Sequence, residues 1–401
     1  MKWQTRGGRF GRRDYHKTAV MLRRALRQVW MHRIDDVSSI DAILRHPAFR
    51  DRAVLERALS QRFFAPFSHQ EVLRGDAFEA RARWSRAALA GVGVDRVRAA
   101  GQAAAAREVQ PGEIESLLDH VRRTVSRATV DLVVGGDGIV DVVDAAVSDI
   151  DRGIKMIARA NDERRHALSL SLEPIVAQPD AWPDDTYLGA SREEARSFSV
   201  AERVDHVAAV FFATGVIQVS DVVTHALIAL AQSPERCDAS DEAVVAEVIR
   251  LYPVNSSITR RPGIDVAVGG RLYRRGEPIT VVPARLERTA AFDPGREQGP
   301  PAWSFGVGPR ACPARRVATT LAATVLGGYR RAGVQIEPGY RHQRSLAASI
   351  RARIGPGDAP ATTARLRRAL AFGRFAAVCA ESYPAAFLRG LSDLAEEIAA
   401  R

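Results

Sequence analysis

The feature that most constrains the fold is one continuous helical pattern that runs from Ser199 to Gln232. It begins with a capping box, in which Ser199 and Glu202 can cap each other's backbone. It ends before Ser233-Pro234, because proline cannot continue a helix. About 33 residues at roughly 1.5 Å each give a length of about 50 Å, enough to cross a whole domain. Since the pattern is apolar on most faces, we expect this helix at the centre of the fold.

Part of this stretch, Val207–Ala231, is also long enough to be considered as a membrane span. It carries Gln218, Asp221 and His225 and lacks basic flanks, which favours a buried core helix. Arginines interrupt the apolar run Val20–Trp30, so we expect no signal peptide there. The sequence therefore predicts a protein without a membrane anchor.

Cysteine content and charge limit the location and the partners. Cys237, Cys312 and Cys379 are widely separated and odd in number, so neither a disulfide framework nor a zinc pattern is expected. A reducing, cytoplasmic location follows. The net charge of +11 would permit binding to nucleic acid. No basic motif with interleaved aromatic residues supports that class, so we expect no nucleic-acid partner.

Cys312 lies at the end of a loop rich in glycine and proline, Phe305–Ala314. Pro313 follows it and suits the first position of a helix, since its missing N–H costs nothing there. The helical pattern continues to about Leu326. The free N–H groups of that helix and the charge of Arg310 favour a thiolate at Cys312. A thiolate held by a rigid loop suits a metal ligand, with a buried structural cysteine as the alternative.

The loop reads Phe-Gly-Val-Gly-Pro-Arg-Ala-Cys-Pro-Ala and resembles the cysteine-ligand loop of the cytochrome P450 family, Phe-Gly-x-Gly-x-Arg-x-Cys-x-Gly. Among the fixed positions only the last differs, where Ala314 replaces glycine. The resemblance implies a mainly α fold with small β-sheets. It also implies haem b between the long central helix and the cysteine-ligand helix, with Cys312 as the ligand of the iron. The expected lack of a membrane anchor resembles the soluble bacterial type of this family.

The resemblance assigns further contacts with haem. Arg260 and Arg310 would bind the haem propionates, a task that suits the forked guanidinium group. Phe305 would shield the sulfur. In the helix expected over Gln70–Ala90 the family usually places a His-x-x-x-Arg or Trp-x-x-x-Arg pair, which this chain lacks. Arg83 is the candidate there, with a solvated arginine face as the alternative.

Three charged residues resemble a structural triad of the family. Glu247 and Arg250 are three residues apart on one helical face, which is a common spacing. Phe292-Asp293-Pro294-Gly295-Arg296 resembles the family's Phe-x-Pro-x-Arg element and follows in the right order. We therefore predict a buried triad of Glu247, Arg250 and Arg296 that locks the loop before Cys312.

The central helix departs from the family at the positions that usually relay protons during oxygen activation. In the expected register Gly215 matches the family's glycine, and Ile217 and Gln218 replace the acid and the alcohol. Isoleucine cannot relay a proton, and the Gln218 amide hydrogen-bonds without titrating. Water or substrate could supply the relay, peroxide could replace dioxygen, or the haem could serve other chemistry. Thr214, Ile217, Val254 and Asn255 are expected to line the substrate space, with Gly215 and Gln218 as catalytic candidates.

The chain divides into a basic arm (1–34), a haem domain (35–354) and a linker with a C-terminal helical extension (355–401). Seven arginines and one acid lie between Arg310 and Arg344. This surface would steer an acidic ferredoxin or flavodoxin as electron donor, unless it is simply a solvated face.

The expected function is a cytochrome P450 monooxygenase that oxidises a small hydrophobic molecule, in bacterial specialised metabolism. One alternative is a haem-thiolate enzyme that uses peroxide or does not hydroxylate its substrate, which the replaced acid and alcohol keep open. Another is a catalytically silent haem-binding scaffold, against which the retained Cys312 argues.

Overall fold

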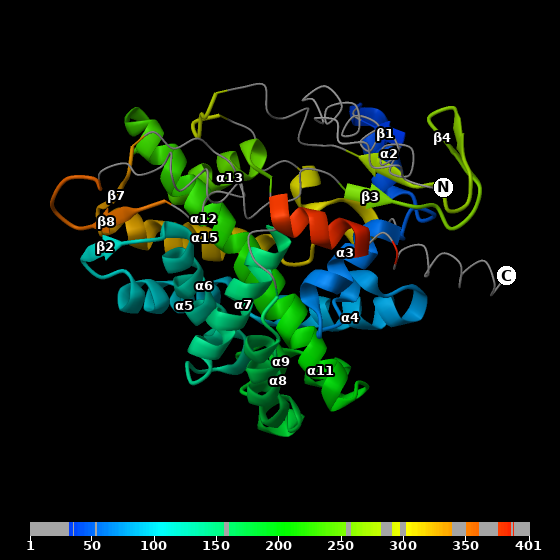
Figure 1. Ribbon diagram of the computed structural model, residues 1–401, viewed down its shortest axis with the longest axis horizontal. Coiled ribbons are helices and arrows are strands. Elements are labelled where there is room, and N and C mark those ends of the chain that lie inside the picture. Colours follow the sequence, from blue (N-terminus) through cyan, green and yellow to red (C-terminus); the bar gives the residue numbers. More distant parts are fainter. Residues whose placement is uncertain are drawn as a thin grey trace, which may run out of the picture.

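The computed structural model describes residues 32–34, 36–52, 54–155, 160–253, 258–281, 291–296, 302–338, 350–360, 376–385 and 388. These residues are mainly helical, and the helices surround one long central helix (Figure 1). The helices are α2 (Val37–Arg45), α3 (Val54–Phe64), α4 (Gly75–Gly91), α5 (Val94–Glu108), α6 (Leu117–Val134), α7 (Val140–Ile154), α8 (Asp162–Val176), α9 (Tyr187–Ala190), α10 (Arg192–Arg196), α11 (Val200–His206), α12 (Gly215–Gln232), α13 (Asp241–Leu251) and α15 (Arg315–Arg331).

Small sheets lie at the edges of this helical body (Figure 1). One has the order β1-β6-β3, in which β6 pairs with β1 in parallel and with β3 in antiparallel register. Another has the antiparallel order β2-β8-β7, and β4 with β5 forms a hairpin. The strands are β1 (His32–Ile34), β2 (Gly112–Ile114), β3 (Ile258–Arg260), β4 (Val266–Val268), β5 (Arg271–Tyr273), β6 (Ile279–Val281), β7 (Val334–Ile336) and β8 (Ala352–Ile354).

The central helix consists of α11, a π-helical stretch (Val207–Thr214) and α12, without a break. The predicted capping box is present: the Ser199 hydroxyl accepts from the Glu202 N–H, and the Glu202 carboxylate accepts from the Ser199 N–H. In the described part of the chain this is the one helix long and apolar enough to cross a membrane, and it is mostly buried. The prediction of a buried central helix is therefore confirmed.

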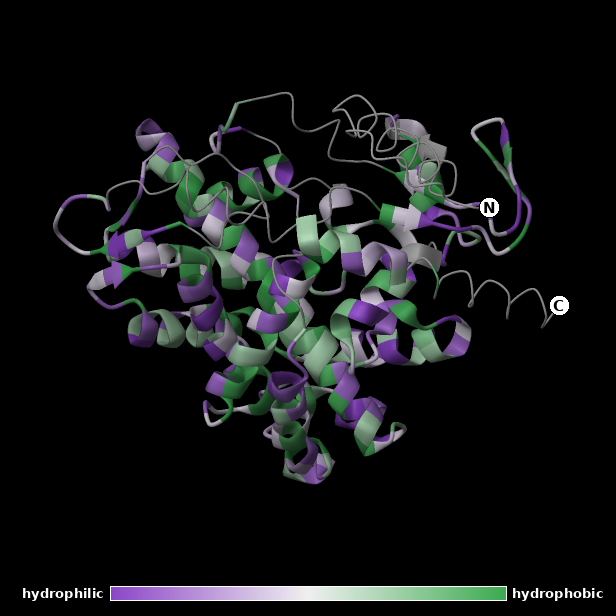
Figure 2. Ribbon diagram, viewed as in Figure 1, coloured by the Kyte–Doolittle hydropathy of each residue, from purple (hydrophilic) through white to green (hydrophobic). Residues whose placement is uncertain are grey.

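The core has two parts. The larger one lies where α5, α6, α7, α12, α13 and α15 pack together, and the smaller one lies between α2 and the sheet of β1, β3 and β6. Hydrophobic and hydrophilic residues alternate along the surrounding helices (Figure 2), as expected for helices with one buried face. This packing holds α12 and α15 against each other, and the loop of Cys312 leads directly into α15.

The mainly α fold with small sheets is confirmed, and two of the predicted helices have other bounds than expected. Helix α15 begins at Arg315, two residues after Pro313, and it continues to Arg331, beyond the expected end near Leu326. Residues 70–72 form a short turn before α4. Nearly all of the arm 1–34 and most of the extension 355–401 lie outside the described residues, so both boundaries stay predictions.

Candidate functional site

The loop of Cys312 is shaped by two glycines with left-handed backbone angles. Gly306 has φ +67° and Gly308 has φ +72°, conformations that residues with a Cβ rarely adopt. A Cβ at Gly308 would also lie 2.5 Å from the Leu44 carbonyl oxygen. The Cys312 N–H donates to the Phe305 carbonyl, with an N···O distance of 2.7 Å. The loop is thus closed on itself and pressed against the end of α2.

The Cys312 side chain is half-buried at the start of α15. Burial raises the pKa of its thiol, and the backbone N–H groups of Ala314 and Arg315 oppose that rise only in part. The expectation that the helix start and Arg310 favour a thiolate is therefore outweighed by burial in the free protein. An electropositive centre bound to the sulfur would reverse this balance.

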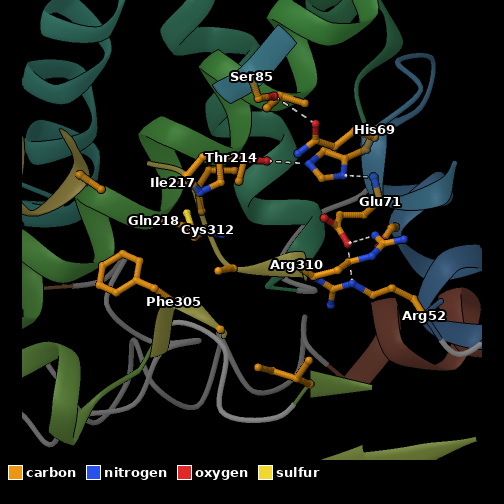
Figure 3. A pocket seen from close by; sticks show the side chains of 18 of the residues that line it. Arg52, His69, Glu71, Ser85, Thr214, Ile217, Gln218, Phe305, Arg310 and Cys312 are labelled. Atoms are coloured by element: carbon orange, nitrogen blue, oxygen red, sulfur yellow. Dashed lines mark hydrogen bonds and ion pairs between the residues drawn. The ribbon is translucent and has the colours of Figure 1, made fainter. Parts of the chain in front are cut away.

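Cys312 lies on the wall of a cavity of about 650 Å³, within the range of small-molecule and cofactor sites. The central helix lines the same cavity through Thr214, Ile217 and Gln218 (Figure 3). Gly215 is in the same turn of the helix but does not line the cavity. Phe305 also lines it, and the Arg315 guanidinium lies 5.8 Å from the centre of its ring. Val254 and Asn255, the other expected lining residues, lie outside the described residues.

A hydrogen-bonded chain joins the central helix to the turn before α4 (Figure 3). The Thr214 hydroxyl donates to the Ala209 carbonyl at 2.8 Å, so it accepts from the Nε2–H of His69 at 2.9 Å. The Nδ1 of His69 accepts from the Glu71 N–H at 3.1 Å. Burial lowers the pKa of His69 to about 4, so this histidine is neutral at pH 7 with its proton on Nε2.

Glu71 lies between two arginines at the cavity wall (Figure 3). Its carboxylate is 2.6 Å from Arg52 Nε and 3.2 Å from an Arg310 terminal nitrogen. Burial alone would raise the pKa of Glu71, but the two arginines hold it at about 2. The Arg310 guanidinium also lies 3.5 Å from the centre of the Phe78 ring. Arg310 is therefore fixed by an ion pair and by a cation–π contact.

The predicted haem-contact arginines have different positions in the structure. Arg310 and Arg260 both line the cavity, and Arg260 is only 2% exposed. Arg83 is exposed on α4 and does not line the cavity, because the face of α4 that does consists of Phe78, Ala82, Ser85 and Arg86. The structure thus does not bring Arg83 to the site.

The predicted triad is formed in part. Arg250 donates two hydrogen bonds of 2.7 Å to the buried carboxylate of Glu247. That carboxylate also accepts from the Asp293 N–H at 3.0 Å, which ties this pair to the segment before Cys312. No ion pair joins Arg296 to Glu247 among the described residues, and the Arg296 Nε is buried without a hydrogen-bond partner there. The backbone of Asp293 makes the contact that was predicted for the Arg296 side chain.

A second charged group lines the cavity near the end of α7. Lys155 Nζ lies 2.7 Å from both Asp151 and Asp221, and all three side chains are buried. Burial lowers the pKa of Lys155, but the two carboxylates outweigh it and the net shift is upward. Burial raises the pKa of Asp151. Asp221 is one turn after Ile217 on the same face of α12.

Sequence reasoning missed Arg52, His69, Glu71, Lys155 and Asp221 as cavity residues. Asp221 did carry a signal, because it is a charged residue inside an apolar stretch. The other four carried no specific signal. Arg52, His69 and Glu71 have partners that are distant in the sequence, and the spacing of four residues between Asp151 and Lys155 is common on helices.

Neither a protein-family model nor a curated protein sequence matches the chain. Solved structures do match in fold. A cytochrome P450 from Thermus thermophilus, described as six-coordinated, has a TM-score of 0.64 at 20% identity, with 81% of this chain and 93% of that chain covered. CYP164A2 from Mycobacterium smegmatis, free of ligand, has a TM-score of 0.61 at 18% identity, over 85% of this chain and 96% of that chain. A variant of the cytochrome P450 OleT, solved with arachidonic acid, has a TM-score of 0.65 at 10% identity, over 82% and 89%.

Proposed function

Because the chain has the cytochrome P450 fold, we propose that it is a haem-thiolate oxidoreductase, namely a monooxygenase that acts on a small hydrophobic molecule. One observation carries this proposal. The thiol of Cys312 and the residues Ile217 and Gln218 of the central helix line the same cavity. A sulfur ligand and the apolar side chain of Ile217 are thus available to one cofactor.

The residues of the cavity fit haem b by charge and by chemistry. Among the described residues more cationic than carboxylate side chains line it, which suits the two negatively charged propionates: Arg52, Arg86, Lys155, Arg260 and Arg310 against Glu71, Asp151 and Asp221. The Arg310 Nε is buried without a hydrogen-bond partner in the described part of the chain. A carboxylate of the cofactor would satisfy it.

Bound haem would supply the oxidation chemistry, with electron density from a thiolate ligand favouring O–O bond cleavage. Cys312 would hold the iron, and Arg260 and Arg310 would hold the propionates. Phe305 would cover the sulfur and exclude water. Glu71 orients Arg310, and Glu247 with Arg250 orients the segment that leads to the loop.

Substrate and partners follow from the same cavity and surface. Phe63, Phe64, Phe78 and Phe305 line the cavity, which favours an apolar substrate. Two structures of similar fold were solved with fatty acids, arachidonic acid and myristic acid, so long-chain acids belong in the first substrate panel.

We further propose specialised metabolism as the setting and a cytoplasmic location. The arginines of α15 favour a ferredoxin or flavodoxin as electron donor.

A second candidate function is a haem-thiolate enzyme that uses peroxide or does not hydroxylate its substrate. The cavity wall of α12 has Ile217 and Gln218 where the resemblance expects an acid and an alcohol. Thr214 donates its proton to a backbone carbonyl and is held by a neutral His69. Neither group is a ready proton donor at pH 7, which favours an oxidant that carries its own protons. A silent haem-binding scaffold remains the third candidate.

The test is haem content followed by oxidant dependence. We expect stoichiometric haem in the purified protein, its loss in Cys312→Ala, and its retention in Cys237→Ala, a control at an exposed cysteine. Turnover of an apolar panel is then compared between hydrogen peroxide and a ferredoxin system with NADPH. Turnover with the ferredoxin system supports the first function, and turnover with peroxide alone supports the second. Haem retention in Cys312→Ala would contradict both.

A further inference from the structure

The C-terminal helical segment of residues 376–385 packs on the body beside α3 (red in Figure 1). Glu381 of this segment forms an ion pair with Arg62 of α3, with an N···O distance of 3.3 Å. Ser382 is only 3% exposed. A smaller cavity of about 340 Å³ separates the segment from the start of α8, and Val378, Glu381 and Ser382 line it. The segment thus packs at a defined position between α3 and the region where α7 ends and α8 begins.

One side chain of this segment reaches the main cavity. Tyr383 lines the same cavity as Cys312, and it is 36% exposed. Because the side chain of Tyr383 is partly exposed and also lines the cavity, it lies where the cavity opens to solvent, and we call this opening the mouth. Phe63 of α3 lines both the main and the smaller cavity, so it stands between them. Ile154 and Lys155 at the end of α7 also line the main cavity.

We propose that the C-terminal segment of residues 376–385 is part of the wall of the substrate cavity, and that Tyr383 contacts the ligand at the mouth and limits the size of what enters. This proposal rests on the proposed function, because it assigns the mouth of that same cavity. It adds a specificity-determining residue from the extension, which the resemblance left without a role.

The contacts indicate how the segment acts. The Arg62–Glu381 pair has side-chain exposures of 33% and 43%, so solvent screens it and it holds the segment only weakly. A weakly held wall can move aside when a bulky ligand passes. The ring of Tyr383 and that of Phe63 offer apolar contact to a ligand with an aromatic or long aliphatic part. A ligand of one or two heavy atoms would pass without touching them.

The experiment compares a bulky and a small ligand of the haem-loaded protein. Phenylimidazole and carbon monoxide are mixed with it in a stopped-flow instrument, and binding is followed by absorption. In Tyr383→Ala the association and dissociation rate constants for phenylimidazole should each rise by about threefold or more, while those for carbon monoxide stay unchanged. Tyr383→Phe keeps the ring and should behave like the unmodified protein.

Leu388→Ala is the matched control, because Leu388 belongs to the same extension and is 66% exposed. Arg62→Glu should raise the phenylimidazole rates, and the double variant with Glu381→Arg should restore them. Rates in Tyr383→Ala equal to those in Leu388→Ala would overturn the proposal. Far-ultraviolet circular dichroism excludes misfolding as the cause of a change.

Failure of the proposed function gives a different result. If the purified protein holds no haem, the same variants are tested for binding of anilinonaphthalene sulfonate by fluorescence. A changed affinity in Tyr383→Ala, but not in Leu388→Ala, would still place the segment at the cavity. Equal affinities in the two variants would overturn it.

Discussion

The partly buried carboxylate of Glu71 provides the most direct test of the electrostatics of the site. It is the acid between Arg52 and Arg310, and its side chain is 22% exposed. Glu71→Gln keeps the shape of the side chain but removes its charge. Two arginines would then face each other in a poorly hydrated wall without their shared counter-ion.

The expected cost follows from the pKa of Glu71. The two arginines lower it from 4.5 to about 2 against the opposing effect of burial. A difference of one pKa unit corresponds to about 1.4 kcal/mol, so neutralising Glu71 should lower the free energy of unfolding by about 3 kcal/mol. Because the folded-state pKa is depressed, this stabilisation is present above pH 4.5 and is lost as the pH falls towards about 2.

Urea unfolding at pH 7, followed by tryptophan fluorescence at matched haem content, measures this cost. Glu79→Gln is the control, because Glu79 makes an exposed ion pair with Arg50 at 3.3 Å. The Arg50 side chain is 51% exposed and that of Glu79 is 35% exposed. Such exposed pairs contribute little. If the free energy of unfolding falls no further in Glu71→Gln than in Glu79→Gln, the reasoning is refuted. Water would then screen the charge of Glu71 from the two arginines.

Three further predictions concern stability. The pKa of His69 is about 4 in the folded protein and 6.5 in the unfolded chain. Between these values the unfolded chain binds one more proton, so the free energy of unfolding should fall by about 3 kcal/mol as the pH drops from 6.5 to 4. Unfolding titrations of His69→Gln should lack this fall. Glu247→Gln should cost about 3–5 kcal/mol in urea unfolding, because its partner is buried with it, and exposed Glu193→Gln should cost far less. Gly308→Ala should cost more than the roughly 1–2 kcal/mol of a left-handed residue, since the added Cβ would meet the backbone of Leu44. Gly333→Ala is the control, because Gly333 has φ +69° and open space around it. Equal decreases of the melting temperature in the two variants would contradict the prediction.

The parts of the site that the sequence could predict are those with local signals. The central helix was predicted because its cap, its apolar pattern and its terminating proline are all within one stretch. The loop of Cys312 was predicted because glycine and proline fix its backbone. Thr214, Ile217, Gln218 and Phe305 then followed from their register next to these two elements.

The remaining site residues depend on contacts between distant segments. Glu71 and Arg310 are 239 positions apart, and no local pattern pairs them. Arg83 was placed by spacing along α4, but the face of a helix that meets a cavity is decided by tertiary packing. The thiol of Cys312 shows the same limit, since the helix start predicts a lowered pKa and burial raises it instead. Tyr383 is far from every motif, so only the folded chain brings it to the cavity.

The most direct test of the central claim is the absorption spectrum of the purified protein after reduction with dithionite and exposure to carbon monoxide. Thiolate ligation by Cys312 predicts a Soret band at the position diagnostic of a haem-thiolate complex. That band should be absent in Cys312→Ala and unchanged in Cys379→Ala. A well-folded protein that binds no haem, or a band unaffected by Cys312→Ala, would contradict the account.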